Sequence, residues 1–198
     1  MLELPTDNLT IGVDEVARGV GYGDVVAAAV ILDSTKYYPE YELIKDSKKL
    51  SAKKRQELYD FIMKNAIATG IGSVSSSVID EINILQATYK AMHIAIDNIN
   101  QSFNNIVVDG NRFLPYKNIP YKCIIQGDNK HLSIAAASII AKVHRDNAIT
   151  KEVEENPDLM KYGFKTNKGY LSAQHIKAIK EFGTLPKHRL TFLKNILN

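Results

Sequence analysis

Short apolar runs rich in β-branched residues predict the strands of this chain. The first runs from Leu9 to Val13 and the second from Asp24 to Leu32, and the glycine-rich segment between them indicates a turn. Three more are expected at about Gly70 to Ser75, in NNIVVDG up to Asp109, and at about Tyr121 to Ile125. The first three can pair antiparallel, whereas helix-separated strands favour parallel pairing, so the pattern predicts a mixed sheet.

Apolar positions at three- and four-residue steps predict the helices. One follows a Ser51 cap and runs to Asn65, and a long amphipathic helix spans Val78 to Ile99. The small and branched residues of LSIAAASIIAKVHRDNAI indicate a third helix, packed closely on the sheet. Further helices are expected from Ala173 to Phe182 and in the tail from about His188. These elements predict an α/β protein with helices around a central sheet.

Composition narrows the class of protein without deciding the function. The chain has 198 residues, 45% of them hydrophobic, which is enough for one sizeable core. Because no repeat or long linker marks a boundary, we expect residues 1–198 to form a single domain, with a helical subregion at about 172–198. The formal charge of +3 suits contact with polyanions but also suits many ordinary cytosolic proteins.

Two further features bear on the expected location. The N-terminal residues lack the basic region and apolar stretch of a signal peptide, and no apolar run approaches the roughly 20 residues that span a bilayer. The single cysteine, Cys123, excludes an intramolecular disulfide, and its apolar neighbours indicate a buried strand residue rather than a nucleophile. We therefore expect a cytoplasmic protein that does not enter membranes.

Four acidic residues follow or end predicted apolar strands: Asp14, Glu15, Asp109 and Asp128. Clustered carboxylates repel one another, so a fold brings them together mainly where a divalent cation neutralises them. Oxygen ligands of this kind favour Mg²⁺ or Mn²⁺ over zinc. Two such ions can promote hydrolysis of a phosphodiester, one by activating the attacking water and the other by stabilising the leaving oxygen.

Other interpretations of these acids stay open at this point. Acids at strand ends are also common turn formers and helix caps, and periodicity cannot show that the four converge. Asp14 and Glu15 are adjacent, and neighbouring side chains in a regular strand point to opposite faces. At least one of them is therefore expected where the strand has ended or bent.

Several motifs, in order, resemble one known family. IGVDEVARG followed by VVAAAVIL is similar to the opening motif of ribonuclease HII, the type 2 ribonuclease H family, and DSKKL from Asp46 to Leu50 resembles a second block. The further matches are IDEINILQAT, VVDGNR, QGDNKHLSIAAASIIAKVHRD, YGFKTNKGY and HRLTF. Together they span about Ile11 to Phe192, so the resemblance covers nearly the whole chain.

The resemblance implies a ribonuclease H-like fold with a central mixed five-stranded sheet. It also implies a metal site of Asp14, Glu15, Asp109 and Asp128 that holds Mn²⁺ or Mg²⁺, with two ions expected. The implied activity is hydrolysis of the RNA strand of RNA/DNA hybrids, and of single ribonucleotides embedded in duplex DNA, by water, leaving 5′-phosphate products. Asp146 is the competing fourth ligand, but its place inside a helix favours an ion pair with a basic neighbour. We expect a monomer.

Substrate contacts follow from the same resemblance. The family's Gly-Arg-Gly turn, which senses 2′-hydroxyls, corresponds to Ala17, Arg18 and Gly19, and Ala17 weakens the match if its position requires a positive φ. The Val20–Asp24 segment also departs from the family pattern, and a bland surface turn stays possible there. Tyr170 matches a tyrosine that stacks on the sugar next to the cut. Residue type alone suggests further contacts, with cations for phosphates and amides for the DNA strand, although solvated charges and exposed amides are the alternative interpretation. These candidates are Lys48, Lys49, His188, Arg189, Asn83 and Gln86.

Two rival functions remain at this stage. Ala17 and the altered loop would suit a hybrid-binding module that has lost catalysis, although all four candidate ligands are present. A DNA-specific metal nuclease of the same broad fold is the other alternative.

Overall fold

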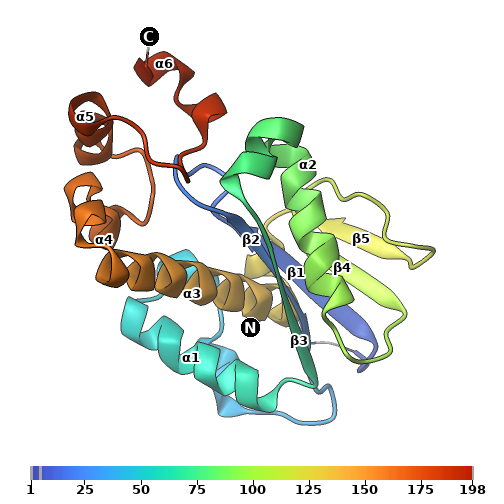
Figure 1. Cartoon of the computed structure of the whole chain (residues 1–198). Helices are drawn as coiled ribbons and strands as arrows, with labels where there is room; N and C mark the ends of the chain where they lie inside the picture. Colours follow the sequence, from blue (N-terminus) through green and yellow to red (C-terminus); the bar gives the residue numbers. More distant parts are fainter. Residues whose placement is uncertain (1, 5, 198) are drawn as a thin grey trace.

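The fold is a five-stranded mixed sheet with helices on both faces (Figure 1). The computed structural model describes residues 2–4 and 6–197. The strand order is β3-β2-β1-β4-β5, in which β1 pairs antiparallel with β2 and parallel with β4. The strands are β1 (Thr10–Val16), β2 (Val25–Ile31), β3 (Ala68–Val74), β4 (Asn105–Asp109) and β5 (Tyr121–Ile124). The predicted mixed sheet is confirmed, and its five strands agree with the implied fold.

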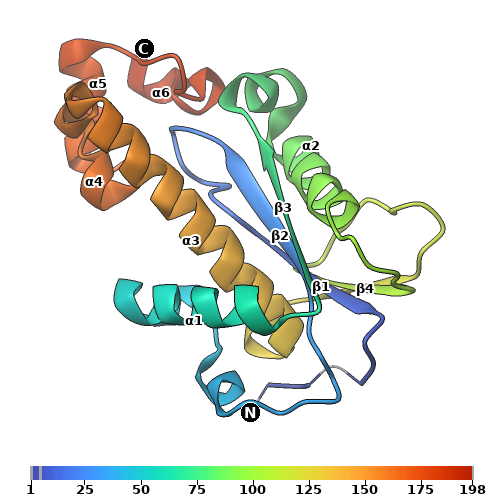
Figure 2. The same ribbon diagram turned by 60° about the horizontal axis from the view of Figure 1, so that its bottom comes forward.

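The helices form two layers around the sheet and a separate group at one end (Figures 1 and 2). The α-helices are α1 (Ala52–Asn65), α2 (Ser76–Asp97), α3 (Leu132–Glu155), α4 (Phe164–Asn167), α5 (Ala173–Phe182) and α6 (Lys194–Leu197). The 3₁₀ turns are η1 (Pro39–Leu43), η2 (Ser47–Lys49), η3 (Gly127–Asn129), η4 (Pro157–Tyr162) and η5 (Leu190–Phe192). Among the described residues, no helix has the length and apolar character needed to cross a bilayer.

Alternation along β1 divides the core between the two faces of the sheet. Ile11 and Val13 belong to the apolar cluster under α2, whereas Gly12 lies against α3. A Cβ on Gly12 would come within 2.3 Å of the Ser133 backbone, so only glycine lets α3 approach this closely. The even-numbered positions of β1 therefore face α3, and the odd-numbered positions face α2.

Helix α2 differs from the single long helix predicted for Val78 to Ile99. It begins earlier, behind the side-chain cap of Ser75, and is interrupted at Asn83, where φ is 67° and ψ is 163°. The Asn83 side-chain oxygen accepts hydrogen bonds from the N–H groups of Leu85 (2.9 Å) and Gln86 (3.2 Å). Asn83 therefore acts as a cap for the second part of the helix, because its oxygen satisfies N–H groups that the interruption exposes.

The C-terminal tail also corrects a prediction. Instead of a helix from about His188, the chain forms the turn η5 and then the short helix α6. The turn η5 lies beside the start of α2 (Figure 2), where the Asp80 carboxylate accepts hydrogen bonds from the N–H groups of Leu190 (2.7 Å) and Thr191 (3.0 Å). This tertiary contact holds the backbone in a form that local helix propensity did not indicate.

Candidate functional site

The parallel pairing of β1 with β4 brings two of the predicted acids together. Val13 lies opposite Val108 in this register, so the next position along each strand places Asp14 beside Asp109. Asp14 is buried and faces α3, as its even position in β1 requires. Ser138 of α3 lies near enough to this carboxylate to favour its ionised form, and the Ser138 hydroxyl lies 3.0 Å from the hydroxyl of Ser47 in η2.

Glu15 reaches the same strand ends from the opposite face of the sheet. It lines a pocket of about 270 Å³ together with Asp109 and with Thr88 and Tyr89 of α2. The expectation that the strand ends or bends at this acidic pair is wrong, because β1 continues in regular register to Val16. The pair instead straddles the sheet, and Asp109 is near both members because it ends its strand.

The fourth acid, Asp128, is held against the end of β4 by the turn η3. The Gly127 N–H donates a 2.7 Å hydrogen bond to Oδ1 of Asp109, which fastens the turn to that strand end. Asp128 follows directly and is buried, and its Oδ1 accepts a 2.8 Å hydrogen bond from the Asn129 side chain. The structure therefore gathers all four predicted acids around the ends of β1 and β4.

The electrostatics of the four acids centre on Asp109. Burial raises the pKa of Asp14 well above its ordinary value, and the charges of Glu15 and Asp109 raise it further. Burial also raises the pKa of Glu15, where the repulsion from Asp109 is opposed by the Arg18 guanidinium. The pKa of Asp128 is raised by burial, then by the charges of Asp109 and Asp46. Asp109 thus opposes ionisation of the other three acids.

This arrangement fits a divalent cation by its chemistry, although it is not a finished ligand cage. Within residues 2–4 and 6–197, no group of three or more His, Cys, Asp or Glu side chains is placed to hold one ion. The donors are carboxylate oxygens whose mutual repulsion an ion would relieve, which suits Mg²⁺ or Mn²⁺. Binding such an ion would require the side chains to rotate toward one another.

The turn after β1 has a positive φ at Ala17, the position where the family resemblance has a glycine. Ala17 has a φ of +68°, so a residue with a Cβ occupies the left-handed region. Its side chain is buried, while the Arg18 side chain is 50% exposed and donates a 3.2 Å hydrogen bond to Glu15. The following loop is not a simple surface turn, which was the alternative interpretation, because Val20 and Tyr22 are both buried.

Comparison with known proteins decides the family. The family model described as Ribonuclease HII matches residues 11–195. A ribonuclease HII from Bacteroides thetaiotaomicron is 46% identical over 189 residues, which cover 96% of this chain and 92% of the relative. The chain belongs to the ribonuclease HII family. It is accordingly a ribonuclease H, an endonuclease that acts on the RNA of RNA/DNA hybrids.

Solved structures agree with the ribonuclease H-like fold. The ribonuclease H2 of Pyrococcus horikoshii superposes with a TM-score of 0.73 at 26% identity, covering 94% of this chain and 96% of that one. Bst-RNase HIII superposes with a TM-score of 0.64 at 20% identity, covering 96% of this chain and 69% of that one. The second likeness concerns the fold alone.

A conformational prediction follows from Ala17 in this ribonuclease HII chain. We expect Ala17→Gly to raise the free energy of unfolding by roughly 0.5–1 kcal/mol, because relief of a left-handed conformation outweighs the entropy that glycine adds to the unfolded chain. Urea denaturation measures this change. The control is Ala66→Gly, where φ is −67° and the same substitution is expected to destabilise. Equal destabilisation by both variants would contradict the proposal that the left-handed conformation of Ala17 is strained.

His188 and Arg189 require a correction, because they were predicted to contact phosphates of the substrate. His188 is 2% exposed and Arg189 is fully buried. Burial, together with the neighbouring His175, lowers the pKa of His188 to about 4, so its ring is neutral near pH 7. Arg189 donates hydrogen bonds to backbone carbonyls of the Arg18 and Gly23 residues. Both side chains therefore belong to the interior of the ribonuclease HII fold.

The other predicted substrate residues lie at the surface. Tyr170 is 45% exposed, and Lys48, Lys49, Asn83 and Gln86 are exposed as well. Lys48 lies near enough to Asp128 for its charge to lower the pKa of that acid, and the Lys49 ammonium donates a hydrogen bond to Asn129. These contacts place the two lysines at the edge of the carboxylate site.

Asp146, the competing fourth ligand, has a partner of its own. Its carboxylate accepts a 2.8 Å hydrogen bond from Lys142 one turn earlier on α3. The predicted ion pair with a basic neighbour is confirmed.

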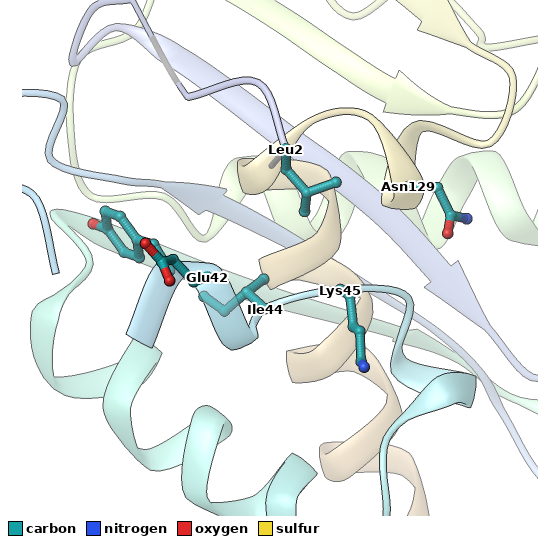
Figure 3. A pocket seen from close by; sticks show the side chains of 6 residues that line it. Leu2, Glu42, Ile44, Lys45 and Asn129 are labelled. Atoms are coloured by element: carbon teal, nitrogen blue, oxygen red, sulfur yellow. The ribbon is translucent and has the colours of Figure 1, made fainter. Parts of the chain in front are cut away.

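The pocket beside the acids also contains residues that the sequence did not single out. Asn111 and Arg112 line it, and both belong to the VVDGNR block. A larger pocket of about 420 Å³ lies between the N-terminal segment and η1, with Leu2, Ile44 and Asn129 in its wall (Figure 3). Its lining includes none of the four acids, whereas Glu15 and Asp109 line the smaller pocket, which is therefore the better candidate for the site.

Proposed function

We propose that this chain hydrolyses both the RNA strand of RNA/DNA hybrids and single ribonucleotides embedded in duplex DNA, leaving 5′-phosphate products. The supporting observation is that Asp109 is electrostatically coupled to each of the other three acids. A site of this kind stores repulsion that divalent cations would relieve, and Bst-RNase HIII has been solved in complex with Mn²⁺.

Asp14, Glu15, Asp109 and Asp128 would hold the ions, for which we propose two positions. Ions bound there would activate the attacking water and stabilise the leaving oxygen. Asp14 and Asp128 are buried, which limits their access to bulk water. Asp109 is fixed by the Gly127 N–H, so one ligand is positioned before any ion binds.

Surface residues around the acids would bind the substrate. Arg18 and Lys48 carry exposed positive charges beside the site and can contact phosphates, which contributes affinity without sequence preference. The Ala17–Gly19 turn would sense the 2′-hydroxyl, and the exposed Tyr170 ring would stack on the neighbouring sugar. Asn83 and Gln86 would contact the DNA strand. Recognition of the 2′-hydroxyl would reject duplexes made only of DNA.

The direct test compares three matched duplexes with the purified chain. One is a continuous hybrid, one carries a single ribonucleotide, and one is all DNA. We expect cleavage of the first two with Mg²⁺ or Mn²⁺, and none with a chelator. Binding without cleavage would favour a hybrid-binding module, and cleavage of the DNA duplex would favour a DNA-specific nuclease. Activity that survives chelation would refute the metal chemistry.

A further inference from the structure

Three buried residues in the C-terminal region lie outside the carboxylate site but contact both proposed recognition elements. His175 and Arg189 are fully buried and His188 is 2% exposed. Burying an arginine costs free energy unless its N–H groups find hydrogen-bond acceptors. The acceptors of Arg189 therefore show which parts of the chain its burial holds in place.

Arg189 fastens the loop that follows the Ala17–Gly19 turn. Its Nη1 donates to the Arg18 carbonyl at 3.0 Å, and its Nε donates to the Gly23 carbonyl at 2.9 Å. Its backbone N–H donates to the Gly21 carbonyl at 2.9 Å. One residue thus binds the loop at three carbonyls, beginning inside the recognition turn itself.

The two histidines connect to the other recognition element through hydrogen bonds whose direction is fixed. The Leu185 N–H donates to Nδ1 of His188, so the neutral His188 ring carries its proton on Nε2. That proton is donated across the 2.9 Å separation to Nε2 of His175. His175 must then carry its own proton on Nδ1, which donates to the Tyr170 carbonyl at 2.9 Å. This series of hydrogen bonds therefore ends at the backbone carbonyl of Tyr170, the proposed stacking residue.

The two halves of this arrangement are also joined directly. The Gly21 N–H donates a 2.9 Å hydrogen bond to the carbonyl of Gly169, the residue before Tyr170. His188 forms an isolated antiparallel bridge with Tyr22 in the same loop. The turn and Tyr170 are therefore linked to each other through the buried segment.

We propose that Arg189 and the His175–His188 pair are positioning residues that set the spacing between the Ala17–Gly19 turn and Tyr170. This spacing determines how well the ribose at the cut is recognised. The inference rests on the proposed function, since it assigns the turn and Tyr170 to the substrate. It predicts that disturbing the buried residues lowers selectivity for a single ribonucleotide more than it lowers cleavage of a continuous hybrid.

Two substitutions of His175 separate positioning from mere stability. In His175→Asn, the amide nitrogen lies near the position of Nδ1 and can still donate to the Tyr170 carbonyl. In His175→Gln, the amide lies near the position of Nε2, so the contact with His188 is kept and the Tyr170 contact is lost. We expect kcat/KM on the single-ribonucleotide duplex to fall about tenfold for the Gln variant. For the Asn variant, we expect kcat/KM to stay within about twofold of the value for the unchanged chain.

A third variant tests the loop. Arg189→Lys keeps the charge, but one ammonium cannot reproduce the two side-chain bonds to Arg18 and Gly23. We expect it to reduce the preference for the single-ribonucleotide duplex over the continuous hybrid by about tenfold. If it fails to fold, the two His175 variants still decide the proposal.

The outcomes distinguish this inference from the proposed function. If the unchanged chain cleaves neither ribonucleotide-containing duplex, the proposed function fails. If it cleaves both, but the Asn and Gln variants lose activity equally or the Gln variant loses none, the positioning role is overturned. Nitrogen NMR of the unchanged chain gives an independent readout, with protons expected on Nδ1 of His175 and Nε2 of His188. The opposite tautomers would also overturn it.

Discussion

Replacing Asp109 by asparagine is expected to lower hybrid cleavage about a thousandfold, equivalent to about 4 kcal/mol of transition-state stabilisation. Asn keeps an oxygen that can accept the 2.7 Å hydrogen bond from the Gly127 N–H, so the turn η3 should stay in place. What the substitution removes is the negative charge that is coupled to Asp14, Glu15 and Asp128. Any loss of activity can therefore be assigned to charge rather than to shape.

The matched control is Asp146→Asn, which makes the same chemical change at the other candidate ligand. Asp146 is paired with Lys142, and we expect its variant to retain Mn²⁺-dependent cleavage of the hybrid. Single-turnover rates on a continuous hybrid compare the two variants. Near-normal activity in Asp109→Asn, or a thousandfold loss in Asp146→Asn, would contradict the proposed ligand set.

Asp109→Asn should also stabilise the fold in the presence of a chelator. The charge of Asp109 raises the pKa of three neighbouring acids, so at neutral pH it opposes their ionised forms in the folded state. Thermal melts with chelator and with Mn²⁺ measure this effect. We expect Mn²⁺ to raise the melting temperature of the unchanged chain more than that of the variant, because a bound ion relieves the same repulsion.

The second large effect expected is a loss of stability as the pH falls from about 6.5 to 4. Burial and the adjacent His175 lower the pKa of His188 from its ordinary 6.5 to about 4. In this window the unfolded chain binds a proton at His188 and the folded chain does not, so acid favours unfolding. The full contribution is about 3 kcal/mol, present above pH 6.5 and lost toward pH 4.

The groups around His188 explain why its ring stays neutral. Tyr22, Tyr162 and Phe164 pack against it, and His175 lies opposite its Nε2. A proton added to Nδ1 would also face the Leu185 N–H, which already donates there. Protonation therefore removes an acceptor in addition to placing charge in an apolar setting.

The change is measured by urea denaturation across pH 4 to 7 for the unchanged chain and for His188→Asn. Asn can still accept from the Leu185 N–H but does not titrate. Asp14, Glu15 and Asp128 act in the opposite direction, because acids with a raised pKa stabilise the fold as they are protonated. The difference between the two chains reports His188 together with its effect on His175, whose own pKa burial also lowers. An identical pH dependence in both would argue against a depressed pKa.

Predictions that depend on local spacing agreed well with the structure. The helix expected from Ser51 to Asn65 is found at Ala52–Asn65, and the one expected at Ala173–Phe182 has those bounds. Apolar periodicity works here because each helix buries one apolar side, α1 in the cluster that it shares with β2 and α3, and α5 in the C-terminal cluster. Where a single side chain decides the backbone, as Asn83 does in α2, the apolar pattern continued through the interruption and gave no sign of it.

The His188–Arg189 segment shows where the chemical character of residues misleads. A histidine and an arginine near the end of a basic chain resemble surface cations. Their residue types alone do not show whether the side chains are exposed or buried. Their partners are the Arg18 carbonyl and the rings of Tyr22 and His175, which no spacing rule connects. Only the folded chain assigns them to the interior.

The sequence by itself determined the order of strands and helices and the four acids at or near strand ends, because these depend on local patterns of residues, and its motifs carried the family resemblance. The tertiary structure decided how the acids meet. Asp14 and Glu15 lie on opposite faces of one unbroken strand, and the parallel register of β1 with β4 places Asp109 between them. That register joins segments about a hundred residues apart, and it is set by packing across the whole sheet rather than by any local pattern.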